Sequence, residues 1–159
     1  MKLNLGCGTD IKEGYVNLDI IKRKGVDVVH DLDKLPYPFN ESTFDEVYAS
    51  HVLEHVDDLM KTMEEIYRIL KPGGALVAKV PYFSSSGAFQ DPTHKHFFAD
   101  DTVKYYIMKN GYNRNFNYEL ASQKLKYTFP FRYLPFRNVL RKILLNVVSE
   151  MQLTLKALK

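Results

Sequence analysis

The segment Leu3–Gly8, which reads Leu-Asn-Leu-Gly-Cys-Gly, constrains the fold more than any other part of the chain. It has the pattern of a short apolar strand that ends in a tight turn. A second apolar run, Val16–Leu18, follows closely and ends on the acid Asp19. Glycines at positions 6 and 8 allow the backbone to turn sharply and to approach a ligand closely. A carboxylate at the tip of the next strand can accept hydrogen bonds from ribose hydroxyls. An ordinary turn also fits two glycines, so the rest of the chain must decide between the two interpretations.

Composition indicates a soluble globular protein. A length of 159 residues predicts one domain that can bury a core, and the hydrophobic content of 45% and charged content of 26% are ordinary. No apolar run is long enough to span a bilayer, and the chain enters its first strand directly, so we expect no secretory signal. Cys7 is the only cysteine, which excludes an internal disulfide and fits a cytoplasmic location.

Charge is distributed unevenly along the chain. Residues 1–101 carry 11 Lys/Arg and 17 Asp/Glu, a net charge of −6, whereas residues 102–159 carry 11 and 2, a net charge of +9. A basic C-terminal third suggests an anionic partner such as a phosphorylated substrate, a membrane surface or nucleic acid. A solvated basic face is the alternative. No recognised nucleic-acid-binding module is visible, so we do not expect nucleic acid as the partner.

The first two connections between strands are short. Only the ten residues 6–15 separate the first two strands, and 20–25 form a brief link to a third strand at Val26–His30. A parallel crossover usually takes a dozen or more residues and a full helix. We therefore expect shortened first crossovers.

Two later units alternate helix and strand. Phe44–Ala49 has the pattern of a strand, and Asp57 or Asp58 would cap a helix that runs to Leu70. The segment Lys71–Gly74 ends this helix and leads into a strand at 75–80. A further helix is predicted from Asp100 to residue 110, followed by strands at 112–120 and 123–131. This alternation is typical of a parallel α/β sheet.

Residues 135–159 have a helical pattern with an apolar stripe and flanking basic residues. The stripe consists of Phe136, Leu140, Ile143, Val147, Met151, Leu155 and Leu158. We expect two parts, a domain at 1–134 and a basic amphipathic helix at 135–159. The helix could pack on the sheet, form a homodimer contact or lie on a membrane.

Several motifs together resemble a class I S-adenosylmethionine-dependent methyltransferase of the small type-11 domain group. The matching segments occur in the family's order: Leu5–Gly8, Asp19, the approach 35–45 to the fourth strand, His51–His55 and Arg68–Gly74. The resemblance implies a doubly wound, Rossmann-like, mostly parallel sheet. The segment 91–98 also looks like a feature of methyltransferases linked to cell-surface sugar biosynthesis, which implies a glycan precursor as one class of acceptor.

The resemblance also implies a cofactor site for S-adenosyl-L-methionine. In it, Gly6, Cys7 and Gly8 lie against the methionine part and ribose, and Asp19 holds the ribose hydroxyls. The remaining expected contacts are Ile20, Asp31 and Leu32 around the adenine, and Ser50 and His51 toward the sulfonium.

Three departures from the family pattern concern the turn and the cover of the site. A third glycine is replaced by Asp10, and the acid that commonly precedes the first glycine is replaced by Asn4. The usual helices before the first strand do not precede Leu3. The loop 82–98, the C-terminal region or a partner subunit would then cover the substrate, because a loop of this length is usually a lid or a binding loop.

Methyl transfer needs alignment and exclusion of water, and a hydroxyl or protonated amine acceptor also needs a base. Histidine suits that role at neutral pH. We predict His94 in the long loop as the base, Asp91 as the group that orients it, and His51 as a further catalytic candidate; His55 and His96 are alternatives. The expected reaction is methyl transfer to oxygen or nitrogen of a small molecule or glycan precursor, in the cytoplasm or at the inner face of the membrane.

The sequence leaves three other functions to consider. His51, Glu54 and His55 match the inverted zincin pattern H-x-x-E-H, in which one helix presents two zinc ligands and a base. No downstream acid stands out as a third ligand, so we expect no metal ion. A nicotinamide-binding fold needs three glycines and a full crossover helix, which are lacking. A non-catalytic module that keeps the methyltransferase fold is the remaining alternative.

Overall fold

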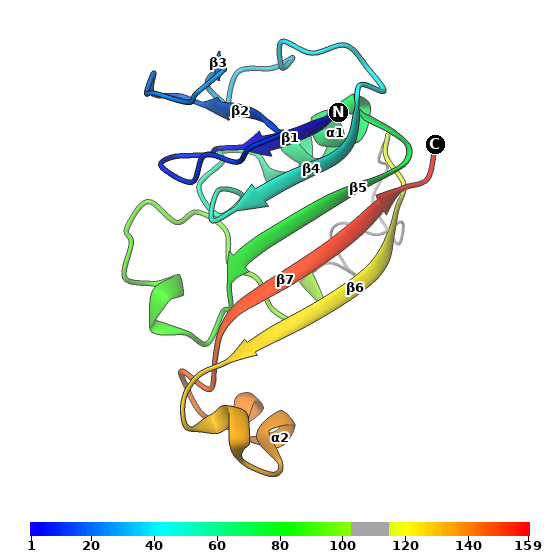
Figure 1. The fold of residues 1–159 in the computed structure, drawn as a ribbon. Coiled ribbons are helices and arrows are strands. Elements are labelled where there is room, and N and C mark those ends of the chain that lie inside the picture. The colour runs from blue at the N-terminus through cyan, green and yellow to red at the C-terminus, as the bar shows by residue number, and fades with distance from the viewer. Residues whose placement is uncertain (103–114) are drawn as a thin grey trace.

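A computed structural model describes residues 1–102 and 115–159 and contains a seven-stranded sheet (Figure 1). The strand order is β3-β2-β1-β4-β5-β7-β6. The strands are β1 (Lys2–Leu5), β2 (Val16–Asp19), β3 (Val28–Val29), β4 (Phe44–Ser50), β5 (Leu70–Pro81), β6 (Tyr118–Tyr127) and β7 (Val148–Ala157). The helices are α1 (Leu59–Ile69), α2 (Arg137–Ile143) and the 3-10 turns η1 (Ser86–Ala88) and η3 (Phe131–Tyr133).

Strands β1 to β5 run parallel to one another, and β7 runs antiparallel to both β5 and β6. The predicted mostly parallel, Rossmann-like sheet is therefore confirmed. Because β7 lies between β5 and β6, the edge strand β6 again points in the direction of β5.

Helix α1 supplies the main cover of the sheet. Asp58, one of the two acids predicted as its cap, accepts hydrogen bonds from the backbone N–H groups of Met60 and Lys61. The expected apolar positions Met63 and Ile66 are fully buried. They pack against alternate strand side chains of the core cluster, which includes Leu3, Val47, Leu76 and Leu155.

The first two crossovers contain no helix, as expected from their length. Asn4 and Asn17 lie side by side on β1 and β2, and their side chains bind the connecting loop instead. The Asn4 Nδ2 donates to the Asp10 carbonyl at 2.7 Å and to the Asn17 Oδ1 at 2.9 Å. The Asn17 side chain also bonds the backbone N–H and carbonyl of Lys12. A buried amide pair thus satisfies the loop's polar groups where a helix would satisfy its own.

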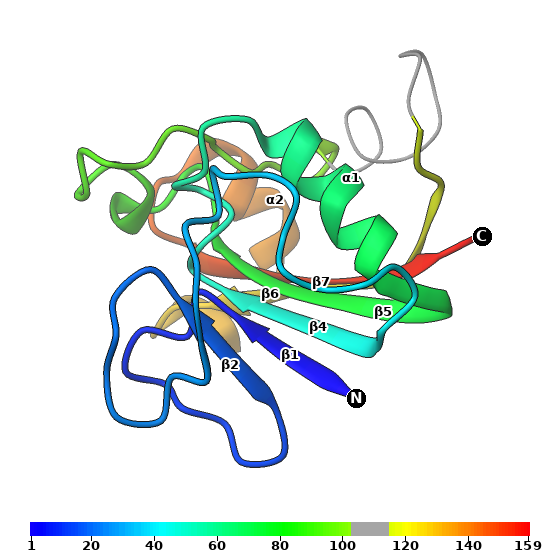
Figure 2. The same ribbon diagram turned by 90° about the horizontal axis from the view of Figure 1, so that it is seen from above.

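The sheet face opposite α1 is polar and partly open. Figure 2 shows α1 and α2 on one side of the sheet, and within residues 1–102 and 115–159 no α-helix covers the other side. The expected winding of helices over both faces is thus realised on one face, because the first crossovers are too short for helices. Tyr48 lies half-buried on the open face, with the ammonium groups of Lys12 and Lys79 4.4 and 5.6 Å from its ring centroid.

The prediction of one amphipathic helix over 135–159 is wrong. Only α2 is helical there, and β7 enters the sheet between β5 and β6. Position 134/135 is therefore not a boundary between two units. The predicted strands 112–120 and 123–131 are represented by the single strand β6, and the helix predicted for 100–110 lies mostly outside the described residues. The described helices include none that could cross a membrane.

Candidate functional site

A pocket of about 260 Å³ lies beyond the carboxyl ends of β1, β2 and β4. Ligands of open parallel sheets bind at this edge. Its lining consists of Gly6, Asp19, Ile20, Asp31, Leu32, Asp33, His51, Val52, His55 and Val56. Six of these were predicted as site residues, and the fold brings them together from four separate segments of the chain.

The glycine turn and the acid of β2 form one wall of this pocket. Gly6 and Gly8 have φ angles of +62° and +53°, which favour glycine. A Cβ on Gly6 would lie 2.4 Å from the Cγ2 of Val52, so a side chain at position 6 would collide with the opposite wall. The Asp19 carboxylate accepts from the N–H groups of Gly8 at 2.8 Å and Ile21 at 2.9 Å. These bonds hold the carboxylate at the turn.

Three predicted cofactor contacts do not line the pocket. Cys7 is buried, and its N–H donates to the Leu18 carbonyl at 2.9 Å, which fastens the end of β1 to β2. Burial raises the pKa of the Cys7 thiol. Gly8 contributes its N–H to Asp19, and Ser50 lies half-buried at the end of β4. Cys7 and Gly8 therefore hold the turn in shape through their backbone N–H groups and do not line the pocket.

The opposite wall is the turn 51–58 between β4 and α1. It is not helical, and His51 has a φ angle of +53°. The inverted zincin interpretation needs His51 and His55 on one helical face, so this geometry is wrong for the chain. His51 instead lies between two carboxylates, with Nδ1 3.2 Å from Glu54 and Nε2 2.9 Å from Glu150. Glu54 and, to a smaller extent, Glu150 raise the pKa of His51, which favours its protonated form.

The long loop after β5 folds back onto this turn. The Glu54 carbonyl accepts from the N–H groups of Lys95 at 2.7 Å and His96 at 3.1 Å, and the His96 Nε2 lies 2.8 Å from the Val56 carbonyl. The loop therefore places His94 against the turn, with its ring centroid 4.7 Å from that of His55.

Asp91 does not orient His94 as predicted. Its Oδ1 accepts from the Thr93 hydroxyl at 2.6 Å, and the Thr93 oxygen lies 2.9 Å from the His55 Nδ1. Hydrogen bonds from Thr93 lower the pKa of Asp91. The orienting partner of His94 is the Ala88 carbonyl, 2.9 Å from its Nδ1. Asp91 thus acts on His55 through Thr93.

Sequence reasoning missed Asp33, Val52 and Val56. The Asp33 Oδ1 accepts from the Asp57 N–H at 2.7 Å and so links the loop after β3 to the turn after β4. Its place two residues after Asp31 was the available signal. Val52 and Val56 had none, because only the non-helical path of the turn directs them into the pocket.

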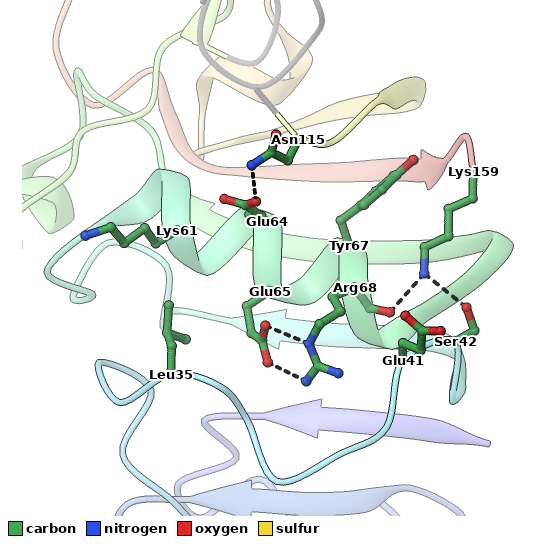
Figure 3. Close-up of a pocket in the computed structure, with 10 residues that line it drawn as sticks. All are labelled: Leu35, Glu41, Ser42, Lys61, Glu64, Glu65, Tyr67, Arg68, Asn115 and Lys159. Atoms are coloured by element: carbon green, nitrogen blue, oxygen red, sulfur yellow. Dashed lines mark hydrogen bonds and ion pairs between the residues drawn. The ribbon is translucent and has the colours of Figure 1, made fainter. Parts of the chain in front are cut away.

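A larger cavity of about 670 Å³ lies elsewhere, along α1 and away from the carboxyl ends of β1, β2 and β4 (Figure 3). Its charged side chains are largely paired. Arg68 forms a two-point ion pair with Glu65, and Lys159 donates to the Arg68 carbonyl at 2.9 Å and to the Ser42 hydroxyl at 3.2 Å. The bonds of Lys159 link the last turn of α1 to the C-terminus and to the segment before β4. We therefore assign this cavity a structural role.

Comparison with known proteins gives a family for this arrangement. A sequence model of the methyltransferase domain matches residues 3–78. The sterol 4-C-methyltransferase strm-1 of Caenorhabditis elegans is 42% identical over 65 residues, which cover 41% of this chain and 19% of that protein. The chain therefore spans about a fifth of the length of this curated relative.

Solved structures share the whole fold. A SAM-dependent methyltransferase from Archaeoglobus fulgidus has a TM-score of 0.68 at 18% identity, covering 98% of this chain and 85% of that one. The [4+2]-cyclase SpnF has a TM-score of 0.67 at 16% identity, covering 99% and 74%. At such identities the likeness shows the fold alone.

S-adenosylmethionine is the cofactor that this family implies, and the pocket has groups that suit it. The Asp19 carboxylate matches the ribose hydroxyls, the apolar side chains of Ile20 and Leu32 match an adenine ring, and the space around Gly8 is open to a ligand. Residues 3–78 therefore match the model of the methyltransferase domain, and the chain has the fold of solved S-adenosylmethionine-dependent methyltransferases.

Proposed function

We propose that this protein transfers a methyl group from S-adenosylmethionine to an oxygen or nitrogen of a small molecule or glycan precursor. The observation that carries the proposal is the single pocket that joins Asp19 and the glycine turn to the histidine-bearing turn 51–58. One side of this pocket has groups that suit the ribose and adenine of the cofactor, and the other side has imidazoles that can accept a proton.

The cofactor supplies an activated methyl group on a sulfonium. The protein's own contribution is binding and alignment. Asp19 holds the ribose, while Ile20 and Leu32 pack against the adenine. The loop 82–98, docked through its backbone on Glu54, helps to exclude water from the transfer.

Two imidazole nitrogens are available as bases. The Nδ1 of His94 faces the Ala88 carbonyl, so this nitrogen carries the proton and Nε2 keeps its lone pair. The His55 Nδ1 faces the Thr93 oxygen, whose own proton goes to Asp91, so the His55 Nε2 is likewise free of a proton. Either Nε2 can accept the proton of an acceptor hydroxyl.

Titration calorimetry with S-adenosylmethionine and S-adenosylhomocysteine tests the cofactor site. We expect saturable binding that weakens about 10- to 100-fold in Asp19→Ala, because hydrogen bonds to a charged group are lost. Asp19→Asn keeps an acceptor and should lose less. Asp10→Ala is the matched control, since Asp10 is an exposed acid on the same turn that does not line the pocket.

Cofactor binding alone would also suit a non-catalytic module or another reaction on this fold, as SpnF illustrates. The second measurement is therefore transfer of a labelled methyl group to a panel of sugar nucleotides, lipid-linked sugars and amines. Label on oxygen or nitrogen supports the proposal. A folded protein that binds no cofactor, or that labels only carbon, would overturn it.

We further propose that the acceptor is reached at the inner face of a membrane, through a basic–apolar surface formed by residues 129–145. Large apolar side chains are exposed there: Phe129 (76%), Tyr133 (69%), Phe136 (79%), Val139 (57%), Ile143 (72%) and Leu145 (75%). Segment 129–145 contains no acid, and Arg132, Arg137 and Lys142 are exposed beside the apolar groups. Exposed apolar groups with adjacent cations suit an anionic lipid surface.

Sedimentation with phospholipid vesicles tests this surface. We expect binding to anionic vesicles that is reduced with neutral ones and lost in the double variant Ile143→Glu/Leu145→Glu. Val29→Glu, an apolar-to-acid change on an exposed strand, is the control. Absence of wild-type binding would refute the membrane proposal. A dimer in light scattering that the double variant abolishes would assign the surface to the homodimer instead.

A further inference from the structure

Three potential metal ligands meet beside the cofactor pocket. Glu54, His55 and His94 each offer one ligand atom, and these atoms all lie within 4.8 Å of one another. Glu54 comes from the turn after β4 and His94 from the loop after β5, so two distant segments converge. His55 also lines the pocket, which places the cluster at its rim.

The buried carboxylate of Glu54 has an unmet requirement. Glu54 is only 1% exposed, and its Oε1 lies 3.2 Å from the His51 Nδ1. Its Oε2 is buried and has no hydrogen-bond partner. An unpaired carboxylate oxygen in a protein interior is costly, and a bound cation would satisfy it.

Both histidines already have the tautomer that a metal requires. Each Nδ1 is hydrogen-bonded away from the cluster. The His55 Nδ1 bonds the Thr93 hydroxyl, which in turn donates to Asp91, and the His94 Nδ1 bonds the Ala88 carbonyl. The two Nε2 lone pairs are therefore left for a ligand. Histidines that bind metals usually donate their second N–H to a carbonyl or carboxylate in this way.

We propose that Glu54, His55 and His94 form a binding site for a divalent transition-metal ion, zinc being best suited to two imidazoles and a carboxylate. Three protein ligands leave a fourth position open, as in catalytic rather than structural zinc sites. The set differs from the sequence motif H-x-x-E-H, because His94 from the loop takes the place of His51. It also departs from our sequence expectation of no metal.

The role that we assign to this metal site rests on the proposed methyl transfer. It narrows the class of methyl acceptor to compounds with a hydroxyl group. A hydroxyl in the fourth position would have its pKa lowered by the ion and release its proton to water. The oxygen lone pair would form the bond to the methyl carbon, and the electrons of the broken carbon–sulfur bond would return to sulfur. His55 and His94 would then hold the ion rather than act as bases.

Zinc binding can be measured without activity. Chelator-treated protein is titrated with Zn²⁺ in competition with a chromophoric chelator, and the wild type is compared with Glu54→Gln and His94→Ala. We expect the affinity to fall by more than about 100-fold in each, since losing a ligand should exceed the loss from a supporting group. Thr93→Val, which removes the support of His55, should cost about 10- to 100-fold. Gln90→Ala is the matched control, because Gln90 is an exposed residue of the same loop outside the cluster.

A second variant remains informative if His94→Ala disturbs the loop. Co²⁺ loaded into His94→Cys should give a sulfur-to-cobalt charge-transfer band that the wild type lacks, although the wild type contains the buried Cys7. Asp19→Ala should bind zinc normally, which separates this proposal from the cofactor proposal. Wild-type zinc affinity no greater than that of Glu54→Gln, or absence of the charge-transfer band, would overturn the metal site.

Discussion

The crossover from β1 to β2 and the crossover from β4 to β5 both connect parallel strands, but they are stabilised by different interactions. Residues 51–69 connect β4 to β5 through α1, whose buried apolar side chains cover the sheet. Residues 6–15 connect β1 to β2 with no helix, and the buried amides of Asn4 and Asn17 bind the loop instead. The apolar crossover gains stability from area removed from water, whereas the polar crossover depends on a few specific bonds.

The difference also explains where the pocket lies. The short first crossover keeps the glycine turn close to the sheet edge, so Gly6 and Asp19 stay at the pocket surface. The longer crossover from β4 to β5 leaves β4 through the non-helical turn 51–58 before α1 begins, and this turn supplies His51 and His55. The pocket wall with Gly6 and Asp19 therefore comes from the polar crossover, and the wall with the histidines comes from the apolar one.

The largest expected effect is in the apolar crossover. Ile66→Ala should lower the free energy of unfolding by about 2–5 kcal/mol, because it deletes a fully buried side chain and leaves a cavity. Urea denaturation measures this. Lys61→Ala, an exposed change on the same helix, should alter stability little. A loss for Ile66→Ala no larger than for Lys61→Ala would mean that α1 contributes little to the core.

A smaller loss of stability, but a direct effect on the site, is expected in the polar crossover. Asn17→Ala removes the partner of Asn4 and of the Lys12 backbone, and should cost about 1–3 kcal/mol through unsatisfied buried groups. Because the same loop begins at the glycine turn, cofactor affinity should fall as well. Calorimetry on the folded variant checks this, with the exposed Asn40→Ala as control. Unchanged affinity would show that the turn is held without the amide pair.

The smallest expected effect concerns the cap of α1. Asp58→Ala should cost about 1 kcal/mol at neutral pH. The pKa of Asp58 is lowered in the folded protein, and the largest cause is the hydrogen bond that its carboxylate accepts from the backbone N–H of Lys61. The stabilisation should therefore be present above about pH 4 and fade as the pH falls through the lowered pKa. Denaturation at several pH values should show the two proteins converging in acid, and Asp58→Asn should keep most of the cap at neutral pH.

Much of the first half of the fold could be predicted because its signals are local. The glycine turn, the short crossovers and the Asp58 cap are each encoded by a few adjacent residues. The C-terminal third could not be predicted in the same way. Val147, Met151 and Leu155 recur every four residues, a spacing that keeps side chains on one face of a helix and also on one face of a strand. Leu153, which lies between Met151 and Leu155, and Ala157, two residues beyond Leu155, are also buried and were the deciding positions, because they give the two-residue period of a strand.

The candidate site was predicted unevenly for a related reason. Asp19 and Gly6 line the same pocket, as predicted, because both lie at the carboxyl ends of neighbouring strands. The pairing of His94 with His55 depends on a loop that bonds the Glu54 carbonyl through its backbone, and no side-chain pattern encodes that contact. The same applies to the link from Asp91 through Thr93 to His55.

The position of β7 between β5 and the edge strand β6 has a consequence for folding. β6 precedes β7 in the chain, yet its only partner in the described sheet is β7, and only β7 joins it to β5. During synthesis, β6 therefore emerges before its neighbour exists, and the 20 residues between the two strands, 128–147, must fold back before the sheet can extend. Such non-local pairing is slow compared with helix formation. We therefore expect closure of the β5-β7-β6 edge to limit the folding rate, with α1 and the parallel strands forming earlier.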